Sequence, residues 1–321
     1  MINVLESTKH VVDNSFFVKI NEKNLESIAV KIKENNINSN LFVVEESFKH
    51  LNTEQILAYN VIYNAINFCF WGNPKWEIEF NGKNYGGSVG LVKCFARALE
   101  NNIDILNPEY LKNMTEDQFE ILTKGNVMIP LANERLKQLN VLGKLIIEKF
   151  DGKFINIFEK GEYNALKITD VLVEDLKEVF CDESMYDNKK VAFYKRAQIV
   201  SVMIDDFVQS NIAKFQITGL EKLTALADYK IPQILREFEI LKYNDDLADR
   251  IDKGILIAQD SQEEVEIRAN TVWSIELLKE LLIKEYPNIM SVQIDKTLWL
   301  MSRKFNKESV KPYHKTITTA Y

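Results

Sequence analysis

Residues that bend or interrupt the backbone are scarce in this chain. Of its 321 residues, 11 are glycine and 6 are proline, whereas these two types together make up roughly 12% of an average protein. Both types break helices when they fall inside them. Their scarcity therefore predicts long helices.

Cysteine and histidine are also sparse. Cys69, Cys94 and Cys181 lie far apart and form no Cys-x-x-Cys pair, which argues against a disulfide framework or a cysteine zinc site and predicts a reducing, cytoplasmic location. The three histidines form no His-x-x-x-His or His-Glu-x-x-His motif. We therefore expect neither a metal site nor another cofactor.

Long apolar runs and an excess of positive charge are missing as well. The most apolar run, residues 61–71, is interrupted by Asn64 and Asn67, and the first residues lack a basic segment followed by an apolar core. We therefore expect no membrane span and no secretion signal. The 40 basic and 47 acidic residues give a formal net charge of −7, which argues against polynucleotide as a partner.

Amphipathic helical spacing recurs along the chain, and 46% of the residues are apolar. Leu25, Ile28, Ala29 and Ile32 follow the i, i+3, i+4, i+7 pattern of one helix face. Caps, capping boxes and a first-turn proline predict further helix starts. These are Thr53, with a helix running toward Phe70, Thr115-x-x-Gln118, Thr218-x-x-Glu221, Pro232, and Ser261-x-x-Glu264, with a helix reaching Leu282.

One segment changes from helical to strand periodicity. Residues 76–80 alternate apolar and polar, and Asn81-Gly82 supplies a tight turn, so we expect a β-hairpin near residues 76–87. The Gly86-Gly87-Ser88 cluster that follows lacks the ending of a nucleotide-binding loop and is read as a turn. No repeat or linker divides the chain. We predict one mainly α-helical domain over residues 1–321, within which residues 1–52 could form an N-terminal subregion.

Composition and periodicity leave the chemistry open. The acidic pairs Asp205-Asp206, Asp245-Asp246 and Glu263-Glu264 are sequence neighbours, and neighbours on a helix point in different directions, so each is read as a solvated face or a cap. The aromatic cluster at residues 68–76 could sandwich a heterocyclic base, although core packing is the more common role of such rings.

Several sequence blocks match a known pattern in their order and spacing. In the first half they are Asn67–Trp71, Arg97–Glu100, Gly143–Ile146 and Glu148–Phe150. In the second half they are Phe193–Ile199, Ala227–Tyr229, Pro232-Gln233, Leu241–Tyr243, Asp245–Leu247, Glu264–Arg268 and Pro312–His314. Together these blocks resemble the queuosine salvage family, the queuosine 5'-phosphate N-glycosylases, across roughly residues 55–321.

This resemblance implies a helical fold similar to the helix-hairpin-helix DNA glycosylases. It places a catalytic aspartate at Asp228, in the Ala-Asp-Tyr block, and a functional lysine at Lys195, in the Tyr-Lys-Arg block. We expect Asp228 to lie between a helix over residues 220–227 and the turn before Pro232. The region that corresponds to the helical hairpin of those glycosylases, residues 217–235, lacks the second glycine after Gly219 that lets backbone amides approach a DNA phosphate, which favours a small nucleotide.

The implied reaction defines what the site must supply. Breaking the ribose C1'–N bond builds positive charge on the sugar, and an ionised carboxylate stabilises that charge or activates the attacking water. An ordinary aspartate, with a pKa near ~3.9, is anionic at neutral pH, so we assign this work to Asp228. Queuine is a 7-deazaguanine and cannot be protonated at position 7, so leaving-group help must come from hydrogen bonds to its other edges.

The charged ends of the implied substrate require partners of both signs, because its 5'-phosphate is anionic and its side-chain amine is cationic. Lys195 and then Arg268 are the candidates for the phosphate or ribose, with a surface ion pair as the alternative for each. His50 and His314 could assist with the phosphate, although surface or structural roles fit them equally.

Block membership suggests further contacts with the base. Phe70, Trp71 and Tyr229 are the candidates to stack on it, and Asn67 or Glu264 could recognise its edge or its amine. We expect a cytoplasmic hydrolase that releases queuine from its nucleotide without metal or cofactor. A monomer is favoured over an oligomer.

Two other functions remain open at this point. A DNA or RNA base glycosylase would show salt-sensitive binding to polynucleotide and a basic stripe. A noncatalytic protein that holds a deazapurine nucleotide would bind tightly without releasing the base.

Overall fold

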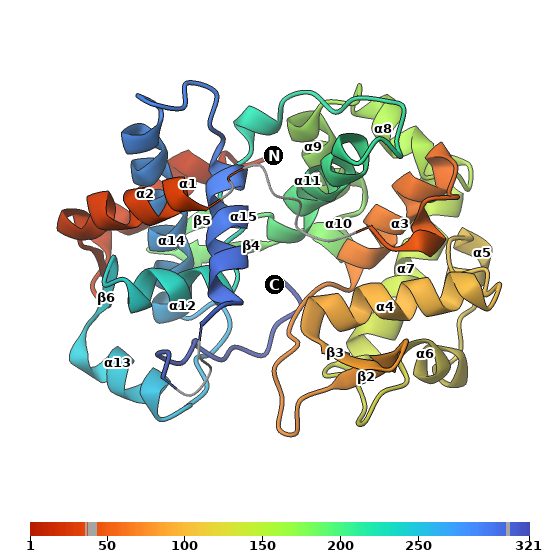
Figure 1. The fold of residues 1–321 in the computed structure, drawn as a ribbon, viewed down its shortest axis with the longest axis horizontal. Coiled ribbons are helices and arrows are strands. Elements are labelled where there is room, and N and C mark those ends of the chain that lie inside the picture. The colour runs from red at the N-terminus through yellow and green to blue at the C-terminus, as the bar shows by residue number, and fades with distance from the viewer. Residues whose placement is uncertain (36, 38–43, 306–308) are drawn as a thin grey trace.

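Two groups of helices lie side by side, with residue 321 between them (Figure 1). The computed structural model describes residues 1–35, 37, 44–305 and 309–321. The group on the right of Figure 1 contains α3 (Thr53–Ala65), α4 (Gly87–Glu100), α5 (Pro108–Lys112), α6 (Glu116–Thr123), α7 (Ala132–Phe150), α8 (Ile155–Lys160), α9 (Ala165–Asp175), α10 (Lys177–Phe180) and α11 (Lys195–Gln209). The group on the left contains α1 (Val4–Asn14), α2 (Leu25–Glu34), α12 (Lys230–Glu237), α13 (Asp245–Asp252), α14 (Gln262–Leu282) and α15 (Ser291–Ser302).

Short strands and 3-10 helices connect these helices. Each sheet of the described residues is a two-stranded antiparallel pair: β1 (Val18–Ile20) with β6 (Leu241–Tyr243), β2 (Glu77–Phe80) with β3 (Lys83–Gly86), and β4 (Glu183–Tyr186) with β5 (Lys189–Ala192). The 3-10 helices are η1 (Glu22–Asn24), η2 (Glu46–Phe48) and η3 (Leu220–Lys222). Helices dominate, which confirms the predicted mainly α fold. The likeness to helix-hairpin-helix glycosylases stays a prediction.

The predicted hairpin is confirmed as the β2–β3 pair. Phe80 pairs with Lys83, and the two residues between them, Asn81 and Gly82, have φ angles of 50° and 73°. Left-handed φ angles at both central positions are the geometry of the type I' turn that Asn-Gly favours.

Most of the predicted helix starts are confirmed. Thr115 and Gln118 form the expected capping box of α6, and the side chain of Ser261 caps α14, which ends at Leu282 as predicted. Pro232 lies in the first turn of α12. These capping signals are local, because residues close in sequence supply the hydrogen-bond partners, so the helix starts depend little on the tertiary structure.

Two expectations about helix ends are wrong. The cap of α3 is Asn52, which forms a capping box with Gln55, and the helix stops at Ala65 instead of reaching toward Phe70. The Thr218-x-x-Glu221 box does not form. The backbone of Thr218 instead pairs with the segment around residue 164, and only the three-residue η3 follows.

The helix expected over residues 220–227 is also wrong, because side chains from other elements bind the backbone amides there. The N–H of Thr224 donates to the side chain of Gln198, and the N–H of Leu226 donates to the side chain of Asp295. Residues 223–227 therefore form an irregular segment that leads directly to Asp228.

The N-terminal residues belong to the left-hand group. Helices α1 and α2 pack against α14, and β1 pairs with β6. The single-domain organisation and a subregion ending near residue 52 stay predictions. None of the helices in the described ranges combines the length and the apolar character needed to cross a bilayer.

Close packing of α5 on α7 depends on a glycine. A Cβ atom added to Gly143 of α7 would lie 2.5 Å from the carbonyl oxygen of Pro108 and 2.9 Å from the Cβ of Leu111. We expect Gly143→Ala to lower the free energy of unfolding by about 1–3 kcal/mol, the usual cost of overpacking. Urea unfolding would measure this loss. The exposed neighbour Lys144, changed to Ala, should stay within about 0.5 kcal/mol of wild type, and equal losses in both variants would contradict the packing argument.

Candidate functional site

The carboxylate of Asp228 caps the first turn of α12. Its Oδ1 atom accepts hydrogen bonds from the backbone N–H of Lys230, at 2.6 Å, and of Ile231, at 3.0 Å. The cap fixes the side chain at the N-terminal end of a helix, where a negative charge is favoured. Both bonds use Oδ1, so the cap does not require Oδ2.

Asp228 shares its surroundings with two ionisable groups from distant parts of the chain. Lys195 begins α11 and Asp295 lies on α15, and both side chains are buried. Burial lowers the pKa of Lys195, and the nearby carboxylates of Asp228, Asp295 and Asp182 oppose that shift. The two helix groups therefore meet where three acidic side chains, Asp228, Asp295 and Asp182, act on one buried lysine.

Asp295 binds a proton much more readily than an ordinary aspartate. Burial and then the charge of Asp228 raise the pKa of Asp295 to about 8, against the opposing effects of the Leu226 N–H and the Lys195 ammonium. A carboxyl group with this pKa is largely protonated at neutral pH, so it can donate a hydrogen bond.

A buried ion pair holds the backbone on both sides of this cluster. The guanidinium of Arg268 binds the carboxylate of Asp182 with two hydrogen bonds, of 2.8 and 2.6 Å. Its Nε donates to the carbonyl oxygen of Ala227 at 3.3 Å, and Oδ2 of Asp182 accepts from the N–H of Lys195 at 3.3 Å. One ion pair thus connects the start of α11 to the residue that precedes Asp228.

Two further arginines hold the chain after α3. Arg135 donates to the carbonyl oxygens of Ile66, Phe68 and Cys69. Arg196 donates to those of Ala65, at 2.6 Å, and Val179. Burial lowers the pKa of Arg135 to about 9 and that of Arg196 to about 10, yet both stay largely protonated at neutral pH. Their charges lie at the C-terminal end of α3, where cations stabilise a helix.

The aromatic candidates lie in and beside the segment that Arg135 holds. The Arg135 guanidinium lies 4.6 Å from the centre of the Phe70 ring, and Trp71 follows, half-buried. The hydroxyl of Tyr229 faces the backbone of Phe70, although burial raises the pKa of Tyr229 well above its usual value. The structure therefore brings Phe70 and Tyr229, from opposite helix groups, to the same place beside Asp228.

Of the other predicted binding residues, Asn67 and Arg268 are held by protein contacts, whereas neither carboxylate oxygen of the buried Glu264 has a hydrogen-bond partner among the described residues. Asn67 is buried and donates to the side chain of Asn64 at 3.0 Å. Glu264 is buried 3.7 Å from Arg268, and burial raises the pKa of Glu264 to about 7. The donors of Arg268 go to Asp182 and Ala227, so its contacts support a positioning role more directly than phosphate binding.

The two histidine candidates differ in exposure. His50 is on the surface. His314 is buried, and its Nε2 atom lies 3.1 Å from the hydroxyl oxygen of Tyr321. Burial lowers the pKa of His314 to about 3, so its ring is neutral at physiological pH. Its contacts support the structural reading.

The sequence analysis missed three functional candidates: Asp295, Asp182 and Arg135. Asp295 lies on the buried face of α15 with Ser291 and Leu298, so an acidic residue within a helical stripe of inward positions was the available signal. Two readings of the acidic pairs are also wrong, because Asp206 is buried in an ion pair of 2.6 Å with Lys296 and Glu264 is buried 3.7 Å from Arg268, so neither is solvated.

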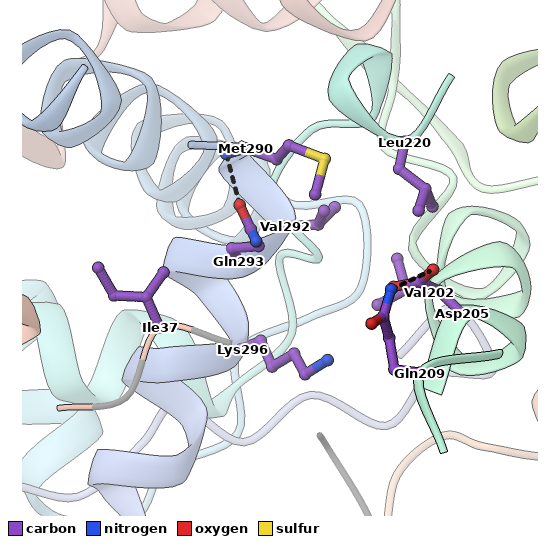
Figure 2. Close-up of a pocket in the computed structure, with 9 residues that line it drawn as sticks. All are labelled: Ile37, Val202, Asp205, Gln209, Leu220, Met290, Val292, Gln293 and Lys296. Carbon is purple, nitrogen blue, oxygen red and sulfur yellow. Dashed lines mark hydrogen bonds between the residues drawn. The ribbon is translucent and has the colours of Figure 1, made fainter. Parts of the chain in front are cut away.

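A cavity of about 420 Å³ lies between α11 and α15 (Figure 2). It shares both helices with the site, because α11 begins with Lys195 and Asp295 precedes Lys296 on α15, but the predicted site residues do not line it. Its lining residues are Ile37, Val202, Asp205, Gln209, Leu220, Met290, Val292, Gln293 and Lys296. Within the described residues, no group of three histidine, cysteine or acidic side chains is arranged to hold a metal ion.

The fold and the site together define a class: a helical protein in which two helix groups enclose a carboxylate–lysine cluster. The sequence model of the queuosine salvage protein family matches residues 47–321, and the chain belongs to that family.

The similarity to named relatives covers most of this chain and most of each relative. The chain is 33% identical to the queuosine 5'-phosphate N-glycosylase/hydrolase of Sphaerobacter thermophilus, over all of this chain and 98% of that protein. It is 28% identical to the protein of that name from Bos taurus, over 97% of this chain and 96% of the relative. The Mus musculus protein of that name is 31% identical over 82% of this chain and 81% of its own length.

The raised pKa of Asp295 predicts how stability depends on pH. The folded protein holds this proton up to about pH 8, whereas an unfolded aspartate releases it near pH ~3.9. The contribution of Asp295 to stability is therefore complete below pH ~4 and is lost as pH rises toward 8. The asparagine of Asp295→Asn cannot titrate. As the pH rises from 5 to 8, the free energy of unfolding of this variant should therefore increase relative to that of wild type by about 1 kcal/mol or more.

Urea unfolding of both proteins at several pH values would measure this difference. The amide oxygen of asparagine can still accept the Leu226 N–H, which makes it a conservative change. A difference in free energy that stays constant with pH would show that Asp295 is not protonated in the folded protein.

Proposed function

We propose that this protein hydrolyses the N-glycosidic bond of queuosine 5'-phosphate and releases queuine. The observation that carries the proposal is the Asp228 carboxylate, fixed by the first turn of α12 beside the buried ammonium of Lys195. The activity in the names of its relatives agrees with this site.

Asp228 is the group that faces the sugar in this proposal. Cleavage of the C1'–N bond makes the ribose resemble an oxocarbenium ion, and a fixed carboxylate stabilises that positive charge more in the transition state than in the substrate. The cap on Oδ1 orients the carboxylate before the substrate arrives. Oδ2 is then the atom that faces C1' or takes the proton of the attacking water.

Asp295 supplies help for the leaving base. The departing deazaguanine gains negative charge. Position 7 is a carbon atom, so protonation there cannot neutralise this charge. Asp295 is largely protonated at neutral pH, so its O–H can donate to the polar edge of the base as the bond breaks. A carboxylate and a protonated carboxyl, in different environments within one site, are a recurrent way to divide the two roles.

Lys195 serves the anionic part of the substrate and the division of charge between the two aspartates. Its ammonium lowers the pKa of Asp295, and the acidic groups of Asp228 and Asp295 oppose the lowering of its own pKa by burial. Phe70, Trp71 and Tyr229 remain the proposed stacking surface for the base. Asn67 and Glu264 remain proposed contacts for its edge or amine, and Arg268 remains the second proposed phosphate contact.

We expect Asp228→Asn to remove at least about 100-fold of kcat on queuosine 5'-phosphate, the lower range for loss of a catalytic acid or base. Asparagine is as good a helix cap as aspartate, so the midpoint of thermal unfolding should change little. Mass spectrometry of released queuine measures turnover, and the exposed Asp249→Asn serves as the matched control. Full activity in Asp228→Asn would overturn the assignment. If the wild-type protein binds queuosine 5'-phosphate without releasing the base, the noncatalytic alternative is favoured.

We expect Lys195→Met to change the pH dependence of turnover as well as its rate. The ammonium lowers the pKa of Asp295, so its removal should raise that pKa further and move the alkaline loss of kcat to higher pH. The rate itself should fall by about 10-fold or more. The exposed Lys144→Met is the control, and an unchanged pH profile in Lys195→Met would separate Lys195 from Asp295.

A further inference from the structure

Residues 309–321, here called the strap, run from the left-hand helix group into the space between the two groups (Figure 1). The strap contains no helix and no named strand, yet His314, Thr316, Thr318 and Tyr321 are all buried. A segment without regular structure that is buried in this way must be held by contacts with other elements.

One end of the strap is bound to α12, the helix that Asp228 caps. The N–H of Lys311 donates to the carboxylate of Glu237 at 2.9 Å, and Gln233 donates to the carbonyl oxygen of Lys311 at 2.8 Å. Arg236 donates to the carbonyl oxygen of Pro312 at 3.4 Å. Three side chains of one helix therefore fix two consecutive residues of the strap.

The middle of the strap packs against residues that adjoin Asp228. The ring centres of Tyr313 and Tyr229 are 4.9 Å apart, and the ammonium of Lys230 lies 4.6 Å from the centre of the Tyr313 ring. The carbonyl oxygen of Lys315 accepts from the N–H of Ile257 at 2.9 Å. These contacts keep the strap in one register along the left-hand group.

The other end of the strap is bound to the segment that carries the aromatic candidates. The carbonyl oxygen of Tyr321 accepts from the N–H of Cys69 at 2.8 Å, and the Cys69 thiol lies 4.0 Å from the carbonyl oxygen of Thr316. Cys69 has a φ angle of 41°, an unfavourable conformation for a residue with a side chain, which needs support from its surroundings. Phe70 and Trp71 follow directly.

Tyr321 is itself held at that end. Its hydroxyl lies 3.1 Å from Nε2 of His314, and its ring centre lies 4.5 Å from the guanidinium of Arg268. The residue that supports Cys69 therefore contacts the arginine that also binds Asp182 and the backbone before Asp228.

We propose that the strap is a positioning element, which fixes the spacing between Asp228 on one helix group and the Phe70–Trp71 segment on the other. Tyr321 and His314 are its positioning residues and do not touch the substrate. The part of this proposal that concerns catalysis depends on the proposed function, whereas the anchoring of Cys69 does not.

The cysteines allow the anchoring to be measured without any substrate. Cys69 lies under the strap, Cys94 is buried in the core of the right-hand group, and Cys181 is exposed. In a Cys181→Ser background, an aromatic disulfide reagent should react slowly with both remaining thiols. Adding Tyr321→Ala should make Cys69 react at least about 10-fold faster while Cys94 stays protected, and Cys69→Ser in the same protein should abolish the fast phase.

The same Tyr321→Ala protein should lose at least about 10-fold in kcat on queuosine 5'-phosphate, with a smaller change in KM, because misplaced groups cost more in the transition state than in binding. Tyr321→Phe, which keeps the ring, should restore most of the loss. Where Cys94 also becomes reactive, the chain has unfolded, and Tyr321→Leu, which removes the ring that contacts Arg268 but keeps an apolar side chain, takes the place of Tyr321→Ala with the same two measurements.

A protected Cys69 in the folded variant would overturn the proposal, and so would a reactive Cys69 with unchanged kcat. A wild-type protein that releases no queuine would count against the proposed function and against the catalytic part of the positioning proposal. Fast labelling of Cys69 in that case would still support the strap as the anchor of this segment.

Discussion

The ion pair between Arg268 and Asp182 is the constraint on which the candidate site depends. Both side chains are almost fully buried, and the removal of one partner from such a pair typically costs about 3–5 kcal/mol, a large share of the roughly 5–15 kcal/mol that stabilises a domain. Apolar residues of similar size could fill the same space. They could not hold the N–H of Lys195 through Asp182 and the carbonyl oxygen of Ala227 through Arg268 at once. The pair is therefore best explained by what it orients.

The right-hand helix group uses the same device in a different form. Arg135 and Arg196 place two buried guanidinium groups at the end of α3, with their hydrogen bonds directed to backbone carbonyl oxygens. These bonds satisfy acceptors that the helix end leaves open and give the following residues a fixed path. The aromatic segment and the acidic cluster are thus each oriented by buried arginine, from opposite sides of the space that the strap crosses.

How much of this could be predicted from the sequence depends on whether the determinant is local. The β2–β3 hairpin and the caps at Thr115 and Ser261 were predictable, because neighbouring residues supply all the partners. The helix over residues 220–227 was predicted wrongly because the amides there bind Gln198 and Asp295. The membership of Asp228 and Lys195 in one site came from family resemblance. Asp295 was missed because only the tertiary fold brings α15 to the residue that it affects.

The arrangement around Lys195 explains why two acids can share one buried place. A second carboxylate near Asp228 would repel it if both were ionised in a medium of low dielectric constant. Asp295 has almost no contact with solvent and retains its proton, while Asp228 is held by two backbone amides and is less buried. The ammonium then balances one negative charge. Because the asymmetry comes from burial, it exists before the substrate binds, and in the proposed reaction it gives the proton donor and the capped carboxylate to two different residues.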